Sequence, residues 1–532
     1  MFTRIRHFTL VVLAAPFVVL GLTAAAPAQT TRYVDDDADP GGDGATWPTA
    51  FKYLQDALTV ANPGDEIHVG QGIYQPDRDA DYPDGTGERG ATFQLISGVA
   101  LYGGYRGLSG DGDPDDRDIA AFETVLSGDL AGNDGPNFKN NDENSYHVVT
   151  GSGCDQTAVI DGCTVTAGNA DASDADRYGG GMYNEDGDPT LANCTISANA
   201  AEYGAGMRNN RSSPVLSNCT ISDNATMWSG GGMHNSESGA TLTDCTFSGN
   251  SGNQGGGMFN WNGSNPTLMN CTFVANTADK GGGMRNHSGR PILTNCAFIG
   301  NLAGQGGGMF NWTSSSPTLF NCTFAANSAT DGRALACDSY QQQYPSTVSM
   351  ANCVLWNGGD EVWNNDGSTI TIAYSDVFGG WPDEGNLDAD PLFVDPGNDD
   401  YHLSTGSPCN DAGDNEAVPA DELDLDGDGD TQEPVPFDLD RNPRFIDDPN
   451  ADDTGNPDPD YPDLPIVDMG AYEFQVPGDL NGDGCVDQAD LGILLGDWGC
   501  TGGDCPGDAD GDGDTDHSDL GVVLAHWGEG CP

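Results

Sequence analysis

Two stretches close to the C-terminus space acidic side chains as a calcium-binding loop does. In both, loop positions 1, 3, 5, 9 and 12 offer side-chain oxygens, position 7 offers a main-chain oxygen, and position 6 is a glycine. Calcium takes about six to eight hard oxygen ligands around such a sharp turn, so each stretch predicts one bound Ca2+ ion. The predicted ligands are Asp479, Asn481, Asp483, Cys485, Asp487 and Asp490 in the first loop, and Asp508, Asp510, Asp512, Asp514, Asp516 and Asp519 in the second.

Each loop is followed by one short apolar helix, and the two loop–helix units stand in tandem. The predicted helices read "LGILLGDW" and "LGVVLAHW" and end in Trp498 and Trp527. This pattern resembles a type I dockerin, which implies a cohesin-like or other surface-protein partner. The alternative, a flexible acidic tail, leaves the repeated tryptophans unexplained. In dockerins loop positions 10 and 11 face the partner; here they differ between copies and from the common Ser-Thr pair, and are Gln488–Ala489 and His517–Ser518.

Cysteines and a third acidic stretch leave alternatives open. Disulfides are expected among four cysteines in or beside the dockerin-like segment, with three pairings possible: Cys485, Cys500, Cys505 and Cys531. The stretch "DELDLDGDGD", residues 421–430, places Asp424, Asp426 and Asp428 at loop positions 1, 3 and 5. It lacks an acidic twelfth residue, because Val435 stands there. It is therefore either a calcium loop or a solvated acidic turn.

The middle of the chain repeats with a period of 25 or 26 residues. Glycine-rich tetrads end in one methionine column, and cysteine, Ile/Phe and asparagine columns follow at fixed distances. A period of this length indicates stacked structural repeats. The methionines are Met182, Met207, Met233, Met258, Met284 and Met309; the cysteines are Cys194, Cys219, Cys245, Cys271, Cys296 and Cys322.

Each repeat is predicted to form one coil of a parallel β-helix. Glycine, asparagine, threonine and proline dominate, no helical stripe is present, and short β-branched runs alternate with turn residues. Stacking aligns identical residues, so a corner that needs glycine needs it in every coil. Asparagine columns are expected to form amide ladders, and methionine, Ile/Phe and leucine columns to fill the interior. The ladder cysteines are expected to act as small buried hydrophobes.

One face of the predicted β-helix carries aromatic and basic side chains. If each methionine and the asparagine two residues later point inward, the residue between them points outward. Exposed aromatics along a solenoid could hold sugar rings or another protein, or they could cover a neighbouring loop. The candidate ligand surface is Tyr183, Arg208, His234, Phe259, Trp261, Arg285, Phe310 and Trp312.

The segments before and after the repeats carry a resemblance to a known family. They include "FQLISGVALYGGYRG", "AVIDGCTVTAGNA", "YHLSTGSPCNDAG" and "VDMGAYEF". They resemble secreted bacterial right-handed parallel β-helix proteins of the pectin-lyase-like fold. The repeats resemble those of polymorphic outer-membrane proteins, with Phe247 and Asn250 as one Phe-x-x-Asn example. An amphipathic helix over residues 49–61 is expected to cap the first coil.

The expected organisation is an all-β solenoid with small additions. We expect a signal peptide over 1–28, an N-terminal cap over 29–64, the parallel β-helix over 65–400, an acidic anchor-type tail over 401–475 and the dockerin-like domain over 476–532. Arg4 and Arg6 precede an apolar run and "AAAPAQ", which predicts export with cleavage after Ala28; an uncleaved anchor is the alternative. The protein is therefore expected to be secreted or held at the cell surface. Its formal charge of −65 argues against nucleic acid and anionic membranes as partners, and no membrane span is expected.

The sequence favours a binding role over catalysis. A solenoid presenting a glycan- or surface-binding face, tethered through a calcium-dependent module, is the first hypothesis. The alternative is a polysaccharide lyase or glycoside hydrolase delivered by its dockerin. Gly-His-Gly and Arg-x-Lys, the motifs of polygalacturonase-like hydrolases, are absent from the sequence, and no catalytic residue is assigned.

Overall fold

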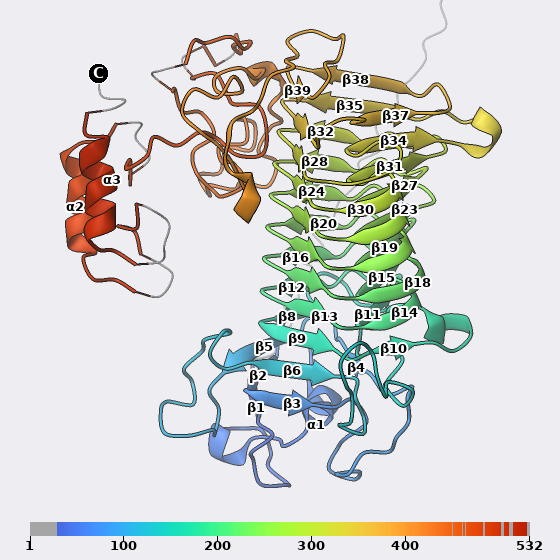
Figure 1. The fold of residues 1–532 in the computed structure, drawn as a ribbon. Coiled ribbons are helices and arrows are strands. Elements are labelled where there is room, and N and C mark those ends of the chain that lie inside the picture. The colour runs from blue at the N-terminus through green and yellow to red at the C-terminus, as the bar shows by residue number, and fades with distance from the viewer. Residues whose placement is uncertain are drawn as a thin grey trace, which may run out of the picture.

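The structure is a computed structural model in which a long stack of parallel coils leads into a folded tail and a small helical module (Figure 1). It describes residues 29–448, 451–459, 461–462, 464–481, 485–501, 505–509 and 514–528. The predicted signal peptide over 1–28 and the predicted ligands Asp483, Asp510 and Asp512 lie outside these residues. Among the described helices, none is long and apolar enough to cross a membrane.

Four parallel sheets, here named A to D, run along the stack; a coil contributes at most one strand to each, and sheet D has strands from only six of the described coils. Sheet A contains β1 (Thr31–Val34), β2 (Glu66–Gly70), β5 (Ala100–Tyr105), β8 (Val159–Asp161), β12 (Thr190–Ala192), β16 (Val215–Ser217), β20 (Thr241–Thr243), β24 (Thr267–Met269), β28 (Ile292–Thr294), β32 (Thr318–Phe320), β35 (Thr347–Ala351) and β38 (Thr369–Ala373). Sheet B contains β3 (Gly72–Tyr74), β6 (Thr124–Ser127), β9 (Cys163–Thr166), β13 (Thr195–Ser197), β17 (Thr220–Ser222), β21 (Thr246–Ser248), β25 (Thr272–Val274), β29 (Ala297–Ile299), β33 (Thr323–Ala325), β36 (Val354–Trp356) and β39 (Asp376–Val377).

The other two sheets form the side of the stack that carries the candidate ligand surface. Sheet C contains β4 (Phe93–Gln94), β7 (Val149–Thr150), β11 (Met182–Glu185), β15 (Met207–Asn210), β19 (Met233–Ser236), β23 (Met258–Trp261), β27 (Met284–His287), β31 (Met309–Trp312), β34 (Leu335–Asp338) and β37 (Val362–Asn364). Sheet D contains β10 (Asn169–Ala170), β14 (Ala200–Tyr203), β18 (Ala225–Ser229), β22 (Ser251–Gln254), β26 (Thr277–Lys280) and β30 (Leu302–Gln305).

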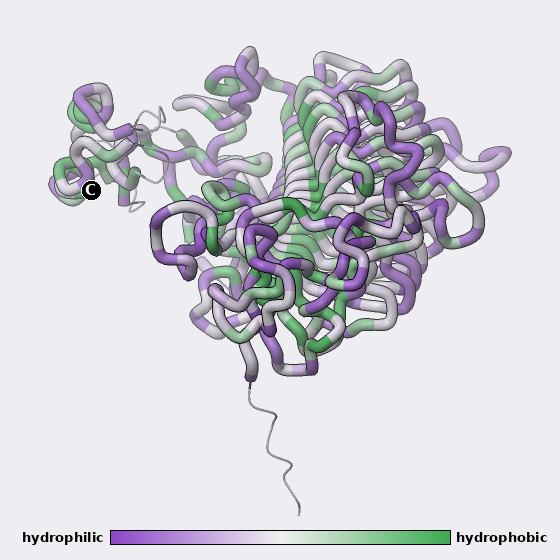
Figure 2. The backbone as a smooth tube through the Cα atoms, turned by 90° about the horizontal axis from the view of Figure 1, so that it is seen from below, coloured by the Kyte–Doolittle hydropathy of each residue, from purple (hydrophilic) through white to green (hydrophobic). Residues whose placement is uncertain are grey.

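Register between coils follows the repeat of the sequence. Met182 pairs with Met207 and Ile196 with Ile221, so like residues stack on like. The methionine, cysteine and Ile/Phe columns are at most 1% exposed and form one continuous core. In the end-on view of Figure 2, hydrophobic positions follow one another from coil to coil. Phe247 and Phe273 stack with ring centroids 4.8 Å apart, close to the spacing of paired strands.

The glycine tetrads turn the chain from sheet D into sheet C. Gly230 adopts a φ of +68°, a left-handed conformation that favours glycine. A Cβ on Gly232 would lie 2.6 Å from the Gly257 carbonyl oxygen of the next coil. The first glycine is therefore required by conformation and the third by the close approach of neighbouring coils. This confirms the predicted reason for the repeated triplet.

The amide ladders are also present. Asn250 accepts hydrogen bonds from the backbone N–H and the Nδ2 of Asn224, both at 3.1 Å, and its own Nδ2 donates to Asn276 at 3.0 Å. A second ladder runs through the asparagine two residues after each methionine, as in the 2.8 Å bond from Asn209 to Asn235. Both columns are nearly or fully buried, and the ladders satisfy amides that could not reach water.

The N-terminal segment differs from its predicted boundaries. The strand β1 pairs with β2 in sheet A, so the stack already begins at Thr31 rather than at residue 65. The helix α1 spans Leu54–Val60, and η1, Trp47–Thr49, precedes it; the predicted start at residue 49 was too early. Leu54, Ala57 and Leu58 face the core, so the helix is amphipathic as predicted.

The tail folds back onto the outside of the stack. It contains the antiparallel pair β40 (Phe393–Asp395) and β41 (Asp400–Leu403) and little other regular structure. Arg444, fully buried, donates to Asn295 of the solenoid at 2.9 Å and forms an ion pair with Glu473 at 3.3 Å. Figure 1 shows the tail lying beside the last coils, with the helical module beyond it.

The module contains the helices α2 (Gln488–Gly496) and α3 (His517–Ala525). Val486, Leu494 and Val523 are fully buried and pack with Phe474 and Val476 of the preceding segment. The described part of this unit is thus a folded helix pair with its own apolar core, and not the flexible tail of the alternative interpretation.

Candidate functional site

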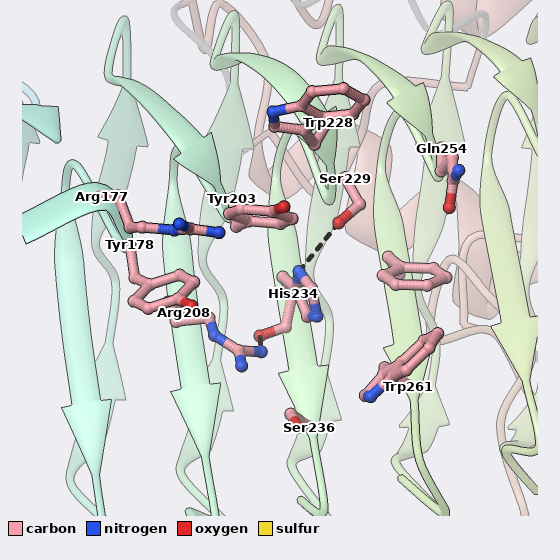
Figure 3. A pocket seen from close by; sticks show the side chains of 11 residues that line it. Arg177, Tyr178, Tyr203, Arg208, Trp228, Ser229, His234, Ser236, Gln254 and Trp261 are labelled. Carbon is pink, nitrogen blue, oxygen red and sulfur yellow. Dashed lines mark hydrogen bonds between the residues drawn. The ribbon is translucent and has the colours of Figure 1, made fainter. Parts of the chain in front are cut away.

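A cleft of about 390 Å³ opens between sheets C and D on the side of the candidate ligand surface (Figure 3). Sheet C provides its floor from β15, β19 and β23, and sheet D provides its wall from β14, β18 and β22. The side chains that line it are Arg177, Tyr178, Tyr203, Arg208, Trp228, Ser229, His234, Ser236, Gln254, Phe259 and Trp261.

Aromatic rings form most of this lining. Tyr178 pairs with Tyr203 in register, and their ring centroids are 5.5 Å apart. His234 packs edge-on against Phe259 at 4.9 Å, and Phe259 lies 6.0 Å from Trp261. Trp228 and Trp261 are 46% and 41% exposed, so two indole rings remain accessible at the rim. Such rings suit contact with the C–H faces of sugars or with apolar side chains.

Two buried arginines beside this aromatic lining have no carboxylate partner among the described residues. Arg208 is 8% exposed; its Nη1 makes only long bonds of 3.4 Å to two carbonyl oxygens, and its Nε has no partner. Arg285 is 5% exposed, and its Nε and Nη1 have no partner. Burial lowers the pKa of each guanidinium to about 10, so both remain charged near neutral pH.

Arg285 and Lys280 extend this cationic region by one coil. The Arg285 guanidinium lies between the rings of Phe259 and Phe310, at 5.3 and 5.4 Å from their centroids. Lys280 Nζ lies 4.9 Å from the rings of both Phe310 and Trp312. These cation–π contacts hold the charges in place without using their N–H donors, of which Arg285 Nε and Nη1 have no hydrogen-bond partner among the described residues. The arrangement is a cationic groove with aromatic walls in a strongly acidic protein.

His234 sits at the centre of the cleft in its neutral form. Burial and then the charge of Arg208 lower the pKa of its imidazole well below the ordinary value. Nδ1 lies 3.1 Å from the Ser229 hydroxyl, and Nε2 has no partner among the described residues (Figure 3). A neutral ring nitrogen of this kind can accept a hydrogen bond or a proton from a bound molecule.

The eleven described lining residues include no carboxylate. Two neighbouring carboxylates are already engaged: Glu202 forms an ion pair with Arg177 at 3.5 Å, and Glu185 accepts from the Tyr183 hydroxyl at 3.0 Å and pairs with Arg211 at 2.9 Å. A pair of carboxylates at glycosidase separation is therefore absent from this lining.

The residues of the candidate ligand surface lie on one side of the stack, but most of them are not exposed as expected. All of its members except Trp261 and Trp312 are at most 9% exposed, because the turns from sheet D lie over the outer side of sheet C. Trp261 is exposed and Trp312 half-buried. The cleft brings together Arg208, His234, Phe259 and Trp261; Arg285, Phe310 and Trp312 continue the groove, and Tyr183 lies next to Tyr178 on its other side.

Sequence reasoning missed Tyr178, Tyr203 and Trp228. A signal for the first two was present, since each stands four residues before a column methionine. The same position holds Ser229, Gln254 and Lys280 in later repeats, and the register of sheet D aligns them all.

The calcium-type loops of the module are closed at their ends. Asp490 is fully buried; its Oδ1 accepts from the N–H groups of Leu480 and Asn481, and its Oδ2 accepts from Asp487. Asp519 repeats this arrangement with Ala509 and Asp516. The last carboxylate of each loop is thus held against the loop's first residues, and Asp490 Oδ2, which accepts one N–H group, keeps lone-pair capacity for a cation. This all-oxygen donor set fits Ca2+.

The cysteines separate into two groups, as their spacing predicted. The column cysteines, Cys194 to Cys322, are buried free thiols. In the module Cys500 bonds to Cys505, which selects one of the three possible pairings, and Cys485 is also disulfide-bonded.

Comparisons with known proteins agree with the repeat architecture. A family model described as "Right handed beta helix region" matches residues 130–273 and 229–377. The repeat region therefore has the right-handed parallel β-helix fold. A comparison with curated proteins found no match.

Solved structures that the chain resembles are polysaccharide-active enzymes at low identity. A structure titled pectate lyase Pel9A is 12% identical with a TM-score of 0.48, over 85% of this chain and 98% of that one. A rhamnogalacturonan lyase is 12% identical with a TM-score of 0.40, over 69% and 90%. A pectin methylesterase from carrot is 11% identical with a TM-score of 0.30, over 65% and 89%.

Proposed function

We propose that the groove between sheets C and D binds an anionic polysaccharide, and that the C-terminal module tethers the protein outside the cell through a calcium-dependent contact. The observation that carries the proposal is the pair of buried arginines without carboxylate partners in a groove whose rim exposes two indole rings, Trp228 and Trp261. In a chain of 83 acidic and 18 basic side chains, carboxylates are abundant, yet none pairs with these two guanidinium groups among the described residues.

An acidic sugar would supply the anionic partner that Arg208 and Arg285 lack. A carboxylate or sulfate can accept two N–H groups of a guanidinium at once, which is stronger and more directional than a neutral hydrogen bond. The sugar ring can pack on Trp261 or Trp228, and a chain of sugars can follow the groove from one coil to the next. The surrounding negative charge weakens long-range attraction, so binding should depend on these local contacts.

The tethering part of the proposal rests on the module's surface. Position-equivalent apolar side chains of its two halves are exposed: Leu495 and Trp498 in the first, Leu524 and Trp527 in the second, at 41–56%. Exposed apolar pairs repeated by internal symmetry suit a protein partner. A cohesin-like or other surface protein is the partner that the dockerin-like sequence implies, and Ca2+ is the ion that its loops would hold.

The test of the groove is a binding panel with matched variants. The full protein with Ca2+ is expected to bind polyuronates or sulfated polysaccharides and to bind neutral glucans much more weakly. Arg285→Met should reduce binding at least about tenfold, because one charge-assisted contact is lost. Arg290→Met, which changes an exposed arginine outside the groove, should leave binding intact.

Arg285→Met has a second readout that separates lost binding from misfolding. Removing a buried charge that has no ionic partner should leave the unfolding free energy unchanged or raise it by about 1 kcal/mol. Lost binding together with lost stability would point to a structural role for Arg285. Equal binding of neutral and acidic polymers would contradict the anionic specificity, and no binding to any polymer would contradict the glycan-binding function itself.

His234 favours a second candidate function, β-elimination of a uronate polymer. Its neutral Nε2 could take the proton α to the sugar carboxylate that Arg208 holds. The electron pair would then form the C4=C5 double bond and expel the glycosidic oxygen, which would take a proton from a tyrosine hydroxyl such as that of Tyr203. Unsaturated products absorbing in the ultraviolet, lost in His234→Ala, would establish catalysis; binding without such products would leave the groove a binding site.

A further inference from the structure

The acidic loop of the tail, residues 421–433, is closed by backbone pairing on the side of the solenoid. Ala420 and Pro434 form an antiparallel bridge, and the Asp421 N–H donates to the Glu433 carbonyl at 2.8 Å. Leu425 packs with Val418, Val435 and Met269, the last from strand β24 of the solenoid. The loop is thus anchored to the coil stack at its base.

The loop brings together three carboxylates, of which the spacing of aspartates in the sequence singled out only Asp426. One oxygen from each of Asp421, Asp426 and Glu433 lies within 4.8 Å of the other two. Asp424 and Asp428, which the spacing assigned to loop positions 1 and 5, use Oδ1 to accept backbone N–H groups of Gly429 and Asp430. In the sequence, Val435 stands at loop position 12, where a calcium loop has its last acidic ligand. In the structure, Asp421 and Glu433 bring two other carboxylates to the loop.

An unpartnered buried oxygen marks this cluster as more than a solvated acidic turn. Asp421 is 0% exposed; its Oδ2 accepts the Leu425 N–H at 2.7 Å, while its Oδ1 has no donor. Glu433 Oε1 is also buried without a donor. No lysine, arginine or histidine among the described residues forms an ion pair with any of the three carboxylates.

The repulsion among these buried carboxylates indicates that a cation is missing from the cluster. Burial, and then repulsion from Asp426 and Asp424, raises the pKa of Asp421; burial and repulsion from Asp428, Asp426 and other acidic residues raise that of Glu433. A buried carboxylate oxygen with no hydrogen bond is expensive, and two facing each other are more so. A divalent cation removes both costs at once.

We infer that Asp421, Asp426 and Glu433 form a calcium site that fastens the tail loop to the solenoid. All three ligands are hard carboxylate oxygens, which favour Ca2+ over transition metals. The exposed position of Asp426 gives the ion a route in from solvent, and the buried Asp421 fixes the base of the site. The site is separate from the two loops of the C-terminal module and does not depend on the groove's ligand.

Counting bound calcium in the full protein tests the inference. After chelation and dialysis against micromolar free Ca2+, Asp426→Asn and Glu433→Gln should each retain one calcium fewer than the unmodified protein. Glu422→Gln, which removes an exposed neighbouring carboxylate outside the cluster, should retain the same number. Because Asp426 is exposed, its substitution should leave the fold intact, and calcium affinity at this site should fall about tenfold or more.

A stability measurement provides the second readout. Calcium should raise the melting temperature of the solenoid and tail in the unmodified protein, and this increase should shrink in Asp426→Asn but not in Glu422→Gln. An unchanged calcium count in both Asp426→Asn and Glu433→Gln would overturn the inference, as would an unmodified protein that holds no calcium at this free concentration.

Discussion

Individual residues matter most in this protein where a charge lacks its expected partner. Arg208 and Arg285 are buried cations with unpartnered donors, and Asp421 is a buried anion with an unpartnered oxygen. Other buried charges have partners of different kinds: Arg444 forms an ion pair with Glu473, and Asp490 accepts backbone N–H groups. Folded proteins rarely leave such groups unsatisfied without a bound partner. The two kinds of unsatisfied residue therefore point to two kinds of ligand, an anion in the groove and a cation in the tail loop.

His402 is a contrasting residue whose charge is satisfied twice. Its Nδ1 and Nε2 each lie 2.6 Å from a carboxylate oxygen, of Asp400 and Asp440 respectively, and so join the β40–β41 pair to a distant part of the tail. Burial alone would lower the pKa of His402, but the hydrogen bonds to Asp440 and Asp400 raise it to about 9.

This raised pKa predicts a pH-dependent stability. The stabilisation is fully present below the unfolded value of about 6.5 and is lost as the pH rises through about 9. Because the side chain is partly exposed, the effect should be small, about 1–3 °C in melting temperature between pH 6 and 9.5. His402→Gln should remove this part of the pH dependence in a melting series; an identical slope in both proteins would contradict the prediction.

Other titrations in the same pH range do not disturb this comparison. Burial raises the pKa of Asp411 to about 8, so its ionisation also destabilises the fold as the pH rises. That contribution is common to both proteins and cancels in the difference between them.

At the scale of the structural element, columns of identical residues stabilise each coil against its neighbours. Each rung of the buried asparagine ladder serves two coils. Asn250 accepts two hydrogen bonds from Asn224 and donates through Nδ2 to the Ile221 carbonyl at 2.8 Å and to Asn276. Removing one rung therefore leaves unsatisfied groups in the coils on both sides.

Asn250→Ala is expected to destabilise the solenoid by about 2–4 kcal/mol, since it strands buried donors and acceptors and leaves a small void. Urea unfolding followed by far-ultraviolet circular dichroism measures the change. Ser248→Ala, on the outward face of the same coil, should change stability by less than about 0.5 kcal/mol. A cost for Asn250→Ala no larger than that of Ser248→Ala would show that the ladder contributes little.

The sequence predicted the stacked coils, but it did not predict sheet D or the turns that cover the outer side of sheet C. The period, the methionine column and the asparagine columns predicted stacking and an interior that the structure confirms, because identical residues must align in a solenoid. Sheet D was not predicted, since its strands, such as "SGNQ" and "TADK", share no apolar pattern. For this reason the candidate ligand surface was expected to be exposed, whereas all of its members except Trp261 and Trp312 are buried beneath the turns that leave sheet D.

In the tail, the sequence pattern predicted the loop but not all of the carboxylates that meet there. Asp424, Asp426 and Asp428 are recognisable as a loop from spacing alone, but Asp421 and Glu433 join Asp426 only through pairing across the base of the loop. Contacts between residues that lie outside a motif's spacing are decided by tertiary folding. Arg444, which reaches Asn295 across the tail–solenoid boundary, is another contact that no local pattern predicts.

The whole molecule combines a rigid stack, an acidic tail packed on it and a module with a small core of its own. The stack buries a continuous interior from Val34 to Val377, whereas the module's described core consists of Val486, Leu494, Val523 and a few neighbours. A unit this small has little apolar area to offset the repulsion among its loop carboxylates. Its stability should therefore depend on bound calcium far more than that of the stack.

Calcium removal should accordingly separate the parts of the molecule. In the full protein, EDTA is expected to abolish or lower the calorimetric transition of the module, to lower that of the stack and tail only modestly, and to expose the residues after Gln475 to protease. Asp490→Ala with Asp519→Ala should reproduce the module's loss in the presence of calcium, because both loops lose their buried closing carboxylate. Asp426→Asn should instead affect only the transition of the stack and tail. If EDTA left the module's transition and its protease resistance unchanged, the calcium-dependent tether would be wrong, while the groove and the tail site would stand or fall on their own measurements.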